Sequence, residues 1–408
     1  MPPQAYLAQQ VSATTAWTMT QVEASVTAAY QNVRFAAPAM TLTVCRSGCD
    51  YTDPLAAFYV AIGYETTAIR NITISIADGT YTETNQIYTE NPLGKFIRVV
   101  GDTTNNANVV LNFTNIGGTN YAGFAANAGG MIGSIDGVTI NGIGAQSTET
   151  SSGTSWNSQS YGAGILAAAG SYVGLGPHVT INHFYYGVAA DNNGLVDAHQ
   201  GGVTVTDAGD VGFMARGNGT IVCNNCHAVR AADTTPGQTV LGCGFDAERG
   251  GSLYIDGSTT QDTYVAGVCA LTGGHMWAHG VVGSGGLGGQ QGFGVALNEN
   301  AAADLTDSKF TGYGTGVYAA GGASGNIDGV TVTGSAGDGI VADDGQLEGT
   351  GTSSQDNGAF GFHAFHQGTL LFYGSLGNTT GNRLGRTAIE PAGVLNGVAY
   401  QASFGAIQ

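Results

Sequence analysis

Positive charge is scarce in this 408-residue chain. Lysine and arginine together number 11 against 29 aspartates and glutamates, which gives a formal net charge of −18, and lysine occurs only at Lys95 and Lys309. A nucleic-acid partner requires clustered cations that neutralise phosphates, so the composition argues against nucleic-acid binding. The same charge disfavours long-range attraction of an acidic polysaccharide, although a local arginine site would still act.

Long apolar runs are also missing. No stretch approaches the roughly 20 apolar residues that a membrane-spanning helix requires. The first residues, Met1 to Tyr6, contain neither the basic region nor the apolar core of a signal peptide. We therefore expect no membrane span and no signal peptide.

Glycine, in contrast, is abundant at 68 residues, and its spacing is regular. A glycine is followed by a bulky apolar residue, a variable residue and usually alanine, first at Gly123-Phe124-Ala125-Ala126. The pattern recurs at Gly164, Gly187, Gly212, Gly244, Gly267, Gly294, Gly316, Gly339 and Gly361. Most steps between these glycines are about 23 residues, so the chain is a repeat with insertions.

The residues between the glycines favour short strands. Leucine-rich repeats need a dense leucine ladder, which is absent, and frequent Gly, Thr, Ser, Asn and Asp argue against helical repeats. Alternating β-branched runs such as Val138-Thr139-Ile140 and Val330-Thr331-Val332 predict strands of a few residues. Two or three such strands per repeat, stacked coil on coil, form a parallel β-helix. We therefore predict an all-β fold with about 10–13 coils over residues 41–388.

Three segments at the ends of the predicted solenoid are expected to have roles of their own. Residues 1–40 carry an apolar stripe at helical spacing, strongest from Val22 to Val33, which predicts a helical segment for attachment or oligomerisation. An alternative is that this helix folds back on its own solenoid. Residues 53–64 are predicted to form a capping helix, with Asp53 as the N-cap and Leu55, Phe58, Tyr59 and Ile62 as its apolar face. At the other end, residues 389–408 are predicted to be a C-terminal cap.

The six cysteines leave several states open. They are Cys45, Cys49, Cys223, Cys226, Cys243 and Cys269. Disulfides and buried free thiols are both compatible with this spacing. A zinc site is disfavoured because the pair at 223 and 226 has no second pair of the same spacing. We therefore expect no metal site.

The residues from 69 to 115 carry a family resemblance. The segments Ile72–Tyr81, Lys95–Asp102 and Asn108–Leu111 resemble the opening coils of pectin-lyase-like right-handed β-helix proteins, in particular the type found in bacteriophage tailspikes and tail fibres. The motif-level resemblance covers about residues 41–115, and later coils match only in period. It implies a right-handed β-helix in a homotrimeric, virion-associated spike or fibre that binds a bacterial surface polysaccharide. Residues 1–40 would then dock on the particle's structural proteins, and the protein would reach the outside on the virion, released by lysis.

Candidate site residues come from positions that recur at similar distances from the repeat glycines, because equivalent positions of stacked coils form rows. Glycoside hydrolysis needs two carboxylates about 5–9.5 Å apart, which coils about 4.8 Å apart can supply. The predicted catalytic residues are Asp246, Glu248 and Asp256. The predicted glycan-binding residues are Arg249, His275, Trp277 and His279, with Trp156 and Tyr161 on a polar insertion at 145–161. Asp343-Asp344 and Glu348 form a weaker second candidate. Solvated outward positions at turns are the favoured alternative for the first set of residues.

Three functions are compatible with this chain. The first is the spike or fibre that binds a glycan, and the second is an enzyme that cleaves a polysaccharide. Hydrolysis is favoured over lyase chemistry, because a lyase needs calcium and a basic residue beside the sugar, and arginine is scarce. No cofactor is expected, and calcium has no support beyond this lyase alternative. The third function is a structural rod or adhesin without catalysis, since fold alone does not decide between them.

Overall fold

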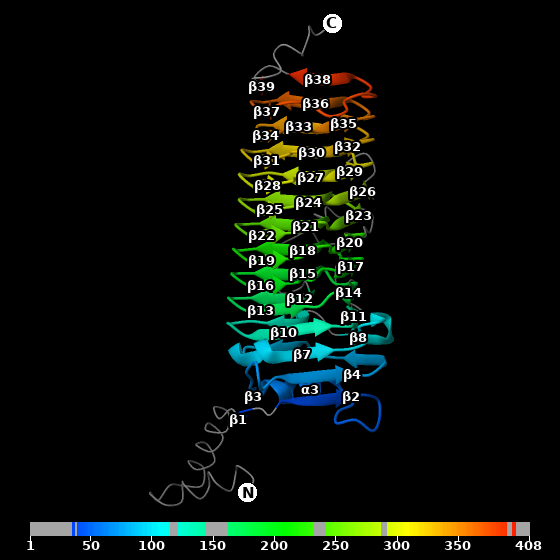
Figure 1. Cartoon of the computed structure of the whole chain (residues 1–408), viewed down its shortest axis with the longest axis vertical. Helices are drawn as coiled ribbons and strands as arrows, with labels where there is room; N and C mark the ends of the chain where they lie inside the picture. The colour runs from blue at the N-terminus through cyan, green and yellow to red at the C-terminus, as the bar shows by residue number, and fades with distance from the viewer. Residues whose placement is uncertain are drawn as a thin grey trace, which may run out of the picture.

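The chain folds into a long right-handed parallel β-helix, seen in the computed structural model (Figure 1). The structure describes residues 35–36, 39–114, 121–142, 162–231, 242–286, 292–389 and 394–396. Three sheets run along the rod, and all pairings between their strands are parallel in the described register. The predicted fold class is therefore confirmed, and the fold implied by the family resemblance is present.

Each full coil contributes one strand to each sheet, which fixes three faces along the rod. Sheet 1 has 14 strands. They are β2 (Met40–Val44), β4 (Ile72–Ile76), β7 (Ile97–Val100), β10 (Met131–Asp136), β13 (Tyr172–Leu175), β16 (Leu195–Asp197), β19 (Thr220–Val222), β22 (Ser252–Tyr254), β25 (His275–Trp277), β28 (Ala302–Asp304), β31 (Ser324–Asn326), β34 (Gln346–Gly349), β37 (Thr369–Phe372) and β39 (Val394–Asn396).

Sheet 2 carries the glycine repeat and has 12 strands. They are β6 (Ile87–Thr89), β9 (Ala122–Ala126), β12 (Ala163–Ala168), β15 (Tyr186–Asp191), β18 (Val211–Arg216), β21 (Cys243–Glu248), β24 (Ala266–Leu271), β27 (Phe293–Leu297), β30 (Thr315–Ala320), β33 (Ile340–Asp343), β36 (Phe360–Phe365) and β38 (Gly385–Ile389).

Sheet 3 follows sheet 1 in each coil and has 11 strands. They are β5 (Gly79–Glu83), β8 (Val109–Phe113), β11 (Val138–Asn141), β14 (Val179–Asn182), β17 (Thr204–Thr206), β20 (His227–Val229), β23 (Thr259–Thr263), β26 (Val282–Gly286), β29 (Lys309–Thr311), β32 (Thr331–Thr333) and β35 (Ser353–Gln355). The 11 and 12 strands of sheets 3 and 2 fall within the predicted number of coils, and sheet 1 extends beyond them.

The repeat glycines form a ladder along sheet 2, which explains why the sequence repeats them. An ideal Cβ on Gly187 would lie 2.6 Å from the carbonyl oxygen of Gly212 in the next coil, and one on Gly212 would lie 2.5 Å from that of Gly244. These distances are too short for any side chain. The residue after each glycine, such as Val188 or Phe213, is instead completely buried inside the rod. The glycine therefore allows close stacking of coils, and the following apolar residue fills the core.

Stacked side chains reinforce the coil register. The rings of Phe213 and Phe245 are stacked inside the rod with centroids 4.9 Å apart. On sheet 3, the side-chain amide of Asn141 donates to Asn112 at 3.0 Å, and that of Asn182 donates to Asn141 at 3.0 Å. Identical residues in register thus satisfy one another, as the parallel pairing of β8, β11 and β14 requires.

The helix α3 (Pro54–Ile62) lies against the first coils, within the predicted span 53–64 (Figure 1). The Asp53 carboxylate accepts hydrogen bonds from the backbone N–H groups of Leu55 and Ala56, as an N-cap residue does. The predicted apolar face is partly wrong. Ala57 and Ala61 are buried beside Phe58, whereas Tyr59 is 49% exposed. The small alanine side chains let the helix pack closely on the core, whereas the Tyr59 side chain lies outside the buried face of the helix.

Short elements lie at the N-terminal end of the rod. The strand β1 (Phe35–Ala36) pairs in parallel with β3 (Tyr64–Glu65), which follows α3. Two 3-10 turns, η1 (Pro92–Phe96) and η2 (Asn106–Asn108), lie between strands of the first coils. The helical stripe predicted in residues 1–40 lies almost entirely outside the described residues. At the other end β39 continues sheet 1 past residue 388, and most of the predicted cap at 389–408 lies outside the description.

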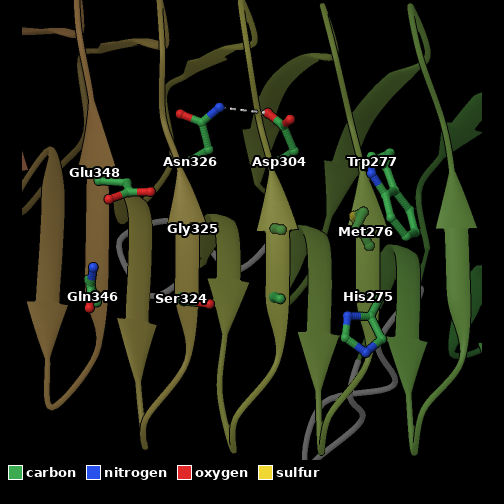
Figure 2. Close-up of a pocket in the computed structure, with 11 residues that line it drawn as sticks. His275, Met276, Trp277, Asp304, Ser324, Gly325, Asn326, Gln346 and Glu348 are labelled. Atoms are coloured by element: carbon green, nitrogen blue, oxygen red, sulfur yellow. Dashed lines mark hydrogen bonds between the residues drawn. The ribbon is translucent and has the colours of Figure 1, made fainter.

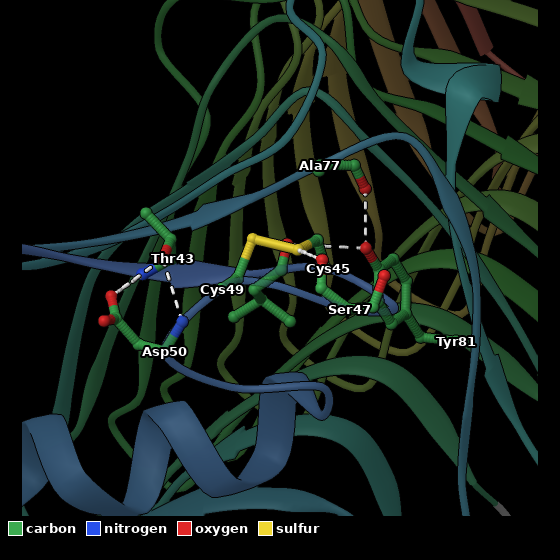
Figure 3. Close-up of a disulfide and its surroundings, with 8 residues drawn as sticks. Thr43, Cys45, Ser47, Cys49, Asp50, Ala77 and Tyr81 are labelled. Carbon is green, nitrogen blue, oxygen red and sulfur yellow. Dashed lines mark hydrogen bonds between the residues drawn. A yellow bond between two sulfur atoms is a disulfide. The ribbon is translucent and has the colours of Figure 1, made fainter.

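All six cysteines form disulfides. Cys45 pairs with Cys49, Cys223 with Cys226, and Cys243 with Cys269. Figure 3 shows the first of them beside Tyr81, whose hydroxyl donates to the carbonyl of Ala77 at 2.7 Å. The disulfide alternative therefore holds and the free-thiol alternative does not. Within the described ranges no helix is long and apolar enough to cross a membrane.

Candidate functional site

The short strands of sheet 1 hold their side chains in straight rows along the rod. In β25 the middle residue, Met276, is buried, while His275 and Trp277 on either side face outward and are exposed. Parallel register places five residues in one outward row, Tyr254, Trp277, Asp304, Asn326 and Glu348. Neighbouring members lie one coil apart, about 4.8 Å. The row therefore presents aromatic, carboxylate and amide groups at a constant spacing.

A groove of about 240 Å³ follows this row over β25, β28, β31 and β34 (Figure 2). Its lining combines one aromatic ring, two carboxylates, two amides, a hydroxyl and an imidazole with small apolar residues. The lining residues are His275, Met276, Trp277, Ala302, Ala303, Asp304, Ser324, Gly325, Asn326, Gln346 and Glu348. The small side chains of Ala302 on β28 and Ser324 on β31, which lie in register on the outer face, leave space in the groove.

An aromatic platform stands at one end of the groove. The rings of Tyr254 and Trp277 stack with centroids 4.4 Å apart and planes inclined by 3°. Each residue is 37% exposed, so the pair keeps an open face toward solvent. Exposed aromatic faces of this kind stack against the apolar face of a pyranose ring, while neighbouring polar groups bind its hydroxyls.

Asp304 in the middle of the groove is held in its charged form. Partial burial raises its pKa, but hydrogen bonds from Thr306 and His279 outweigh that effect and bring the pKa below its ordinary value. The Thr306 hydroxyl lies 2.7 Å from Oδ1, and the His279 ring nitrogen Nε2 lies 3.1 Å from Oδ2. Asn326 also donates to Oδ1 at 3.1 Å (Figure 2). Both carboxylate oxygens of Asp304 therefore already have partners within the protein.

Glu348 closes the other end of the groove and is more open. The Tyr373 hydroxyl donates to its Oε2 at 3.3 Å. The second carboxylate oxygen has no hydrogen-bond partner among the residues that the structure describes. Glu348 therefore offers a free acceptor to a ligand in the groove.

A second group of carboxylates lies on sheet 2. Asp246 is only 3% exposed, and its Oδ1 has no hydrogen-bond partner within the described part of the chain. Burial, and then the Glu248 and Asp210 carboxylates, raise the pKa of Asp246 well above its usual range, against a weaker opposing effect of Arg216. Glu248 lies in register with Arg216 on the neighbouring strand. The site thus holds a buried carboxyl with a raised pKa beside a second carboxylate, but Asp246 has little access to solvent.

The structure separates the predicted catalytic residues. Asp246 and Glu248 share strand β21 of sheet 2, whereas Asp256 follows β22 of sheet 1. Asp256 instead contacts His279, whose Nδ1 lies 3.4 Å from its Oδ1. The same histidine contacts Asp304, so these three residues form a separate cluster beside the groove.

The predicted glycan contacts are distributed over several places. His275 and Trp277 line the groove, and His279 supports Asp304 next to it. Arg249 points to Glu248 instead, with its Nε 4.0 Å from the carboxylate. Trp156 and Tyr161 lie outside the described residues. Of the weaker second candidate, Asp343 lies on sheet 2, where the hydroxyl of Tyr318 donates to it at 2.7 Å, and Glu348 lies in the groove.

Several residues in or beside the groove are not among the site residues predicted from the sequence. Tyr254 and Asn326 each follow a repeat glycine by ten residues, as Trp277 and Asp304 do. The common offset was therefore a usable signal, but only charged residues, histidine and tryptophan were selected from it. Gln346 lacks that signal, because it lies in the second outward row of sheet 1, in register with Ser324.

No site for a metal ion is evident in the parts of the chain that the structure describes. No group of three or more His, Cys, Asp or Glu side chains there, the Asp256, His279 and Asp304 cluster included, is arranged so that it could hold a metal ion. The carboxylates of the groove and those around Asp246 belong to different sheets. These residues therefore do not form the multi-carboxylate set that calcium binding requires.

Comparison with known proteins supports the fold alone. No family model matches the chain, and no curated protein is similar to it in sequence. Among solved structures, the catalytic domain of a GH87 alpha-1,3-glucanase variant in complex with tetrasaccharides is 12% identical, with a TM-score of 0.57 over 89% of this chain and 68% of that chain. The catalytic domain of GH87 alpha-1,3-glucanase in complex with nigerose is also 12% identical, with a TM-score of 0.52 over 88% of this chain and 68% of that chain. The chain therefore shares the parallel β-helix architecture of these domains.

Proposed function

We propose that this protein is a rigid rod that binds a bacterial surface polysaccharide along the groove of sheet 1. The observation that carries the proposal is the stacked, half-exposed pair Tyr254 and Trp277 at the head of a row of hydrogen-bonding side chains. The coil spacing of about 4.8 Å is comparable with the length of one sugar ring in an extended chain, so successive coils can contact successive sugars. Solved β-helices of similar architecture hold saccharides, in keeping with this function.

The test is binding to an array of bacterial surface polysaccharides. Wild-type protein is expected to bind a subset of glycans, and Trp277→Ala is expected to weaken that binding about tenfold or more, because it removes the stacking surface. Tyr59→Ala on α3, at a more exposed aromatic residue distant from the groove in the sequence, serves as the control and is expected to bind normally. Equal binding by wild type and Trp277→Ala would contradict the proposal.

We further propose that the rod is a virion-associated, homotrimeric spike or fibre that attaches through residues 1–40. Support comes from the tailspike-like segments at 72–111 and from the three disulfides, which persist in oxidising surroundings outside the cell. Light scattering is expected to give three times the chain mass of 41.2 kDa. A stable monomer under native conditions would remove the trimer from the proposal.

A second candidate function is polysaccharide hydrolysis at Asp246 and Glu248. One observation favours it: burial raises the pKa of Asp246 beside the Glu248 carboxylate, a difference between two carboxyl groups that a general acid and its partner need. Release of reducing ends from a bound polysaccharide is expected to fall at least a hundredfold in Glu248→Gln. If wild type releases none from any polysaccharide that it binds, the rod is a binding protein without catalysis.

A further inference from the structure

Positive charge is absent from the groove, although the groove holds two carboxylates. Asp304 and Glu348 are the charged residues of its lining, and neither lysine nor arginine is among the eleven lining residues. His275 is the only lining side chain able to become cationic. A glycan built of uronic acids would thus bring its own negative charges against Asp304 and Glu348 without a compensating cation.

The two carboxylates differ in how far their oxygens already have partners within the protein. Asp304 has His279 at 3.1 Å and donors on its other oxygen, so its hydrogen-bonding capacity is used within the protein. Glu348 receives one neutral hydroxyl from Tyr373 and keeps a free oxygen. The acceptor still open to a ligand is therefore the Glu348 carboxylate, three coils from Trp277.

We infer that the groove selects glycans that carry a free amine, with one sugar stacked on Trp277 and an amino sugar at Glu348. This inference rests on the proposed glycan-binding function and specifies its ligand class. The row from Trp277 to Glu348 spans roughly 14 Å, the sum of three coil steps, which matches a tetrasaccharide lying along the rod. The ammonium group donates to the free oxygen of Glu348, while Asn326 binds a hydroxyl between the two ends and Gln346 binds one on the same strand as Glu348.

The experiment compares a panel of α- and β-linked tetrasaccharides, each prepared in neutral, N-acetylated, amine-bearing and uronic forms, by titration calorimetry. Wild type is expected to bind the amine form about fivefold more tightly than the neutral form, and to bind the uronic form most weakly. High salt is expected to remove the amine preference and leave neutral binding unchanged.

Variants distinguish a failure of the proposed ligand class from a failure of glycan binding in the groove. Glu348→Gln is expected to abolish the amine preference, so that the amine and neutral forms bind with about equal affinity, and Trp277→Ala is expected to weaken all forms. Glu65→Gln on the exposed strand β3 makes the same change of charge elsewhere and is expected to behave as wild type. Tight binding of the uronic form, or an amine preference that survives in Glu348→Gln, would overturn the ligand class but not the groove. If no form binds, or Trp277→Ala changes nothing, the proposed function itself fails.

Discussion

The side chains of Tyr254 and Trp277 stack across neighbouring coils with ring centroids 4.4 Å apart and both faces nearly parallel. Neither ring is buried in the core, so the stack is not a packing requirement of the rod. Each ring instead restricts the rotation of the other and holds one flat apolar surface toward solvent. Preorganised surfaces of this type lower the entropic cost of binding.

Tyr254 is therefore expected to matter through the position of Trp277. Tyr254→Ala should weaken glycan binding about threefold to tenfold, because Trp277 gains rotational freedom, whereas Tyr254→Phe should bind within about twofold of wild type. Titration calorimetry with a glycan identified on the array measures both. Equal loss in the Phe and Ala variants would mean that the hydroxyl, and not the stack, is what the glycan needs.

The glycine ladder predicts a strong position dependence of alanine substitutions. Gly187→Ala places a methyl group 2.6 Å from the Gly212 carbonyl oxygen and 2.3 Å from Val205, and is expected to destabilise the rod by more than about 3 kcal/mol. Gly273→Ala is the matched control, since nothing lies within 4 Å of its Cβ and only the positive φ of 72° opposes it. Its expected cost is about 1 kcal/mol. Urea unfolding followed by circular dichroism distinguishes the two, and equal costs would refute the ladder.

Disulfide removal should have different effects at different bridges. Cys243–Cys269 joins strands β21 and β24 of successive coils across a separation of 26 residues, so Cys243→Ser with Cys269→Ser is expected to cost about 3 kcal/mol. Cys45–Cys49 closes a loop with a separation of 4, and its double serine variant is expected to cost about 2 kcal/mol or less. Thermal unfolding measures both, and the reverse order would contradict the chain-entropy explanation.

The cap of the rod should respond to pH through Glu83. Burial, and then the neighbouring Asp53 carboxylate, raise the pKa of Glu83 from 4.5 to about 8. The folded state thus keeps a proton that the unfolded chain loses near pH 4.5. The stabilising contribution is complete below pH 4.5 and is lost as the pH rises through about 8.

Glu83→Gln removes this dependence because the amide is neutral at every pH. The variant is expected to be more stable than wild type at pH 8, on the order of 1 kcal/mol, and to lose this advantage at pH 4. Melting temperatures at pH 4, 6 and 8 provide the measurement, with Glu65→Gln as a solvent-exposed control. A parallel pH profile for wild type and Glu83→Gln would show that Glu83 does not hold the proton.

The coiled architecture was predictable from the sequence because one steric requirement repeats in every coil. Each repeat glycine meets the carbonyl of the next one, so its spacing directly records the coil length. The N-cap at Asp53 was predictable for a similar reason, since capping depends on residues adjacent in the chain. The fold was therefore predictable from features that are local in the sequence or repeat in every coil.

Features that depend on register between coils were not predictable. Cys243 lies beside Ala266 in register, and Asp246 lies beside Cys269, so the disulfide from Cys243 to Cys269 is a diagonal between strands. The separation of 26 residues between these cysteines differs from the repeat step of 23 between Gly244 and Gly267, so the sequence pattern does not reveal the pair. The burial of Asp246 was hidden in the same way, because an aspartate between apolar neighbours on a strand has the pattern of a solvated residue.

The most direct test is an experimental structure of the protein with a bound tetrasaccharide taken from the array. We predict one sugar stacked on Trp277 and the following sugars along Asp304 and Asn326 toward Glu348, with one coil for each ring. A saccharide bound on sheet 2 near Asp246, or at the ends of the rod with the sheet 1 groove empty, would contradict this.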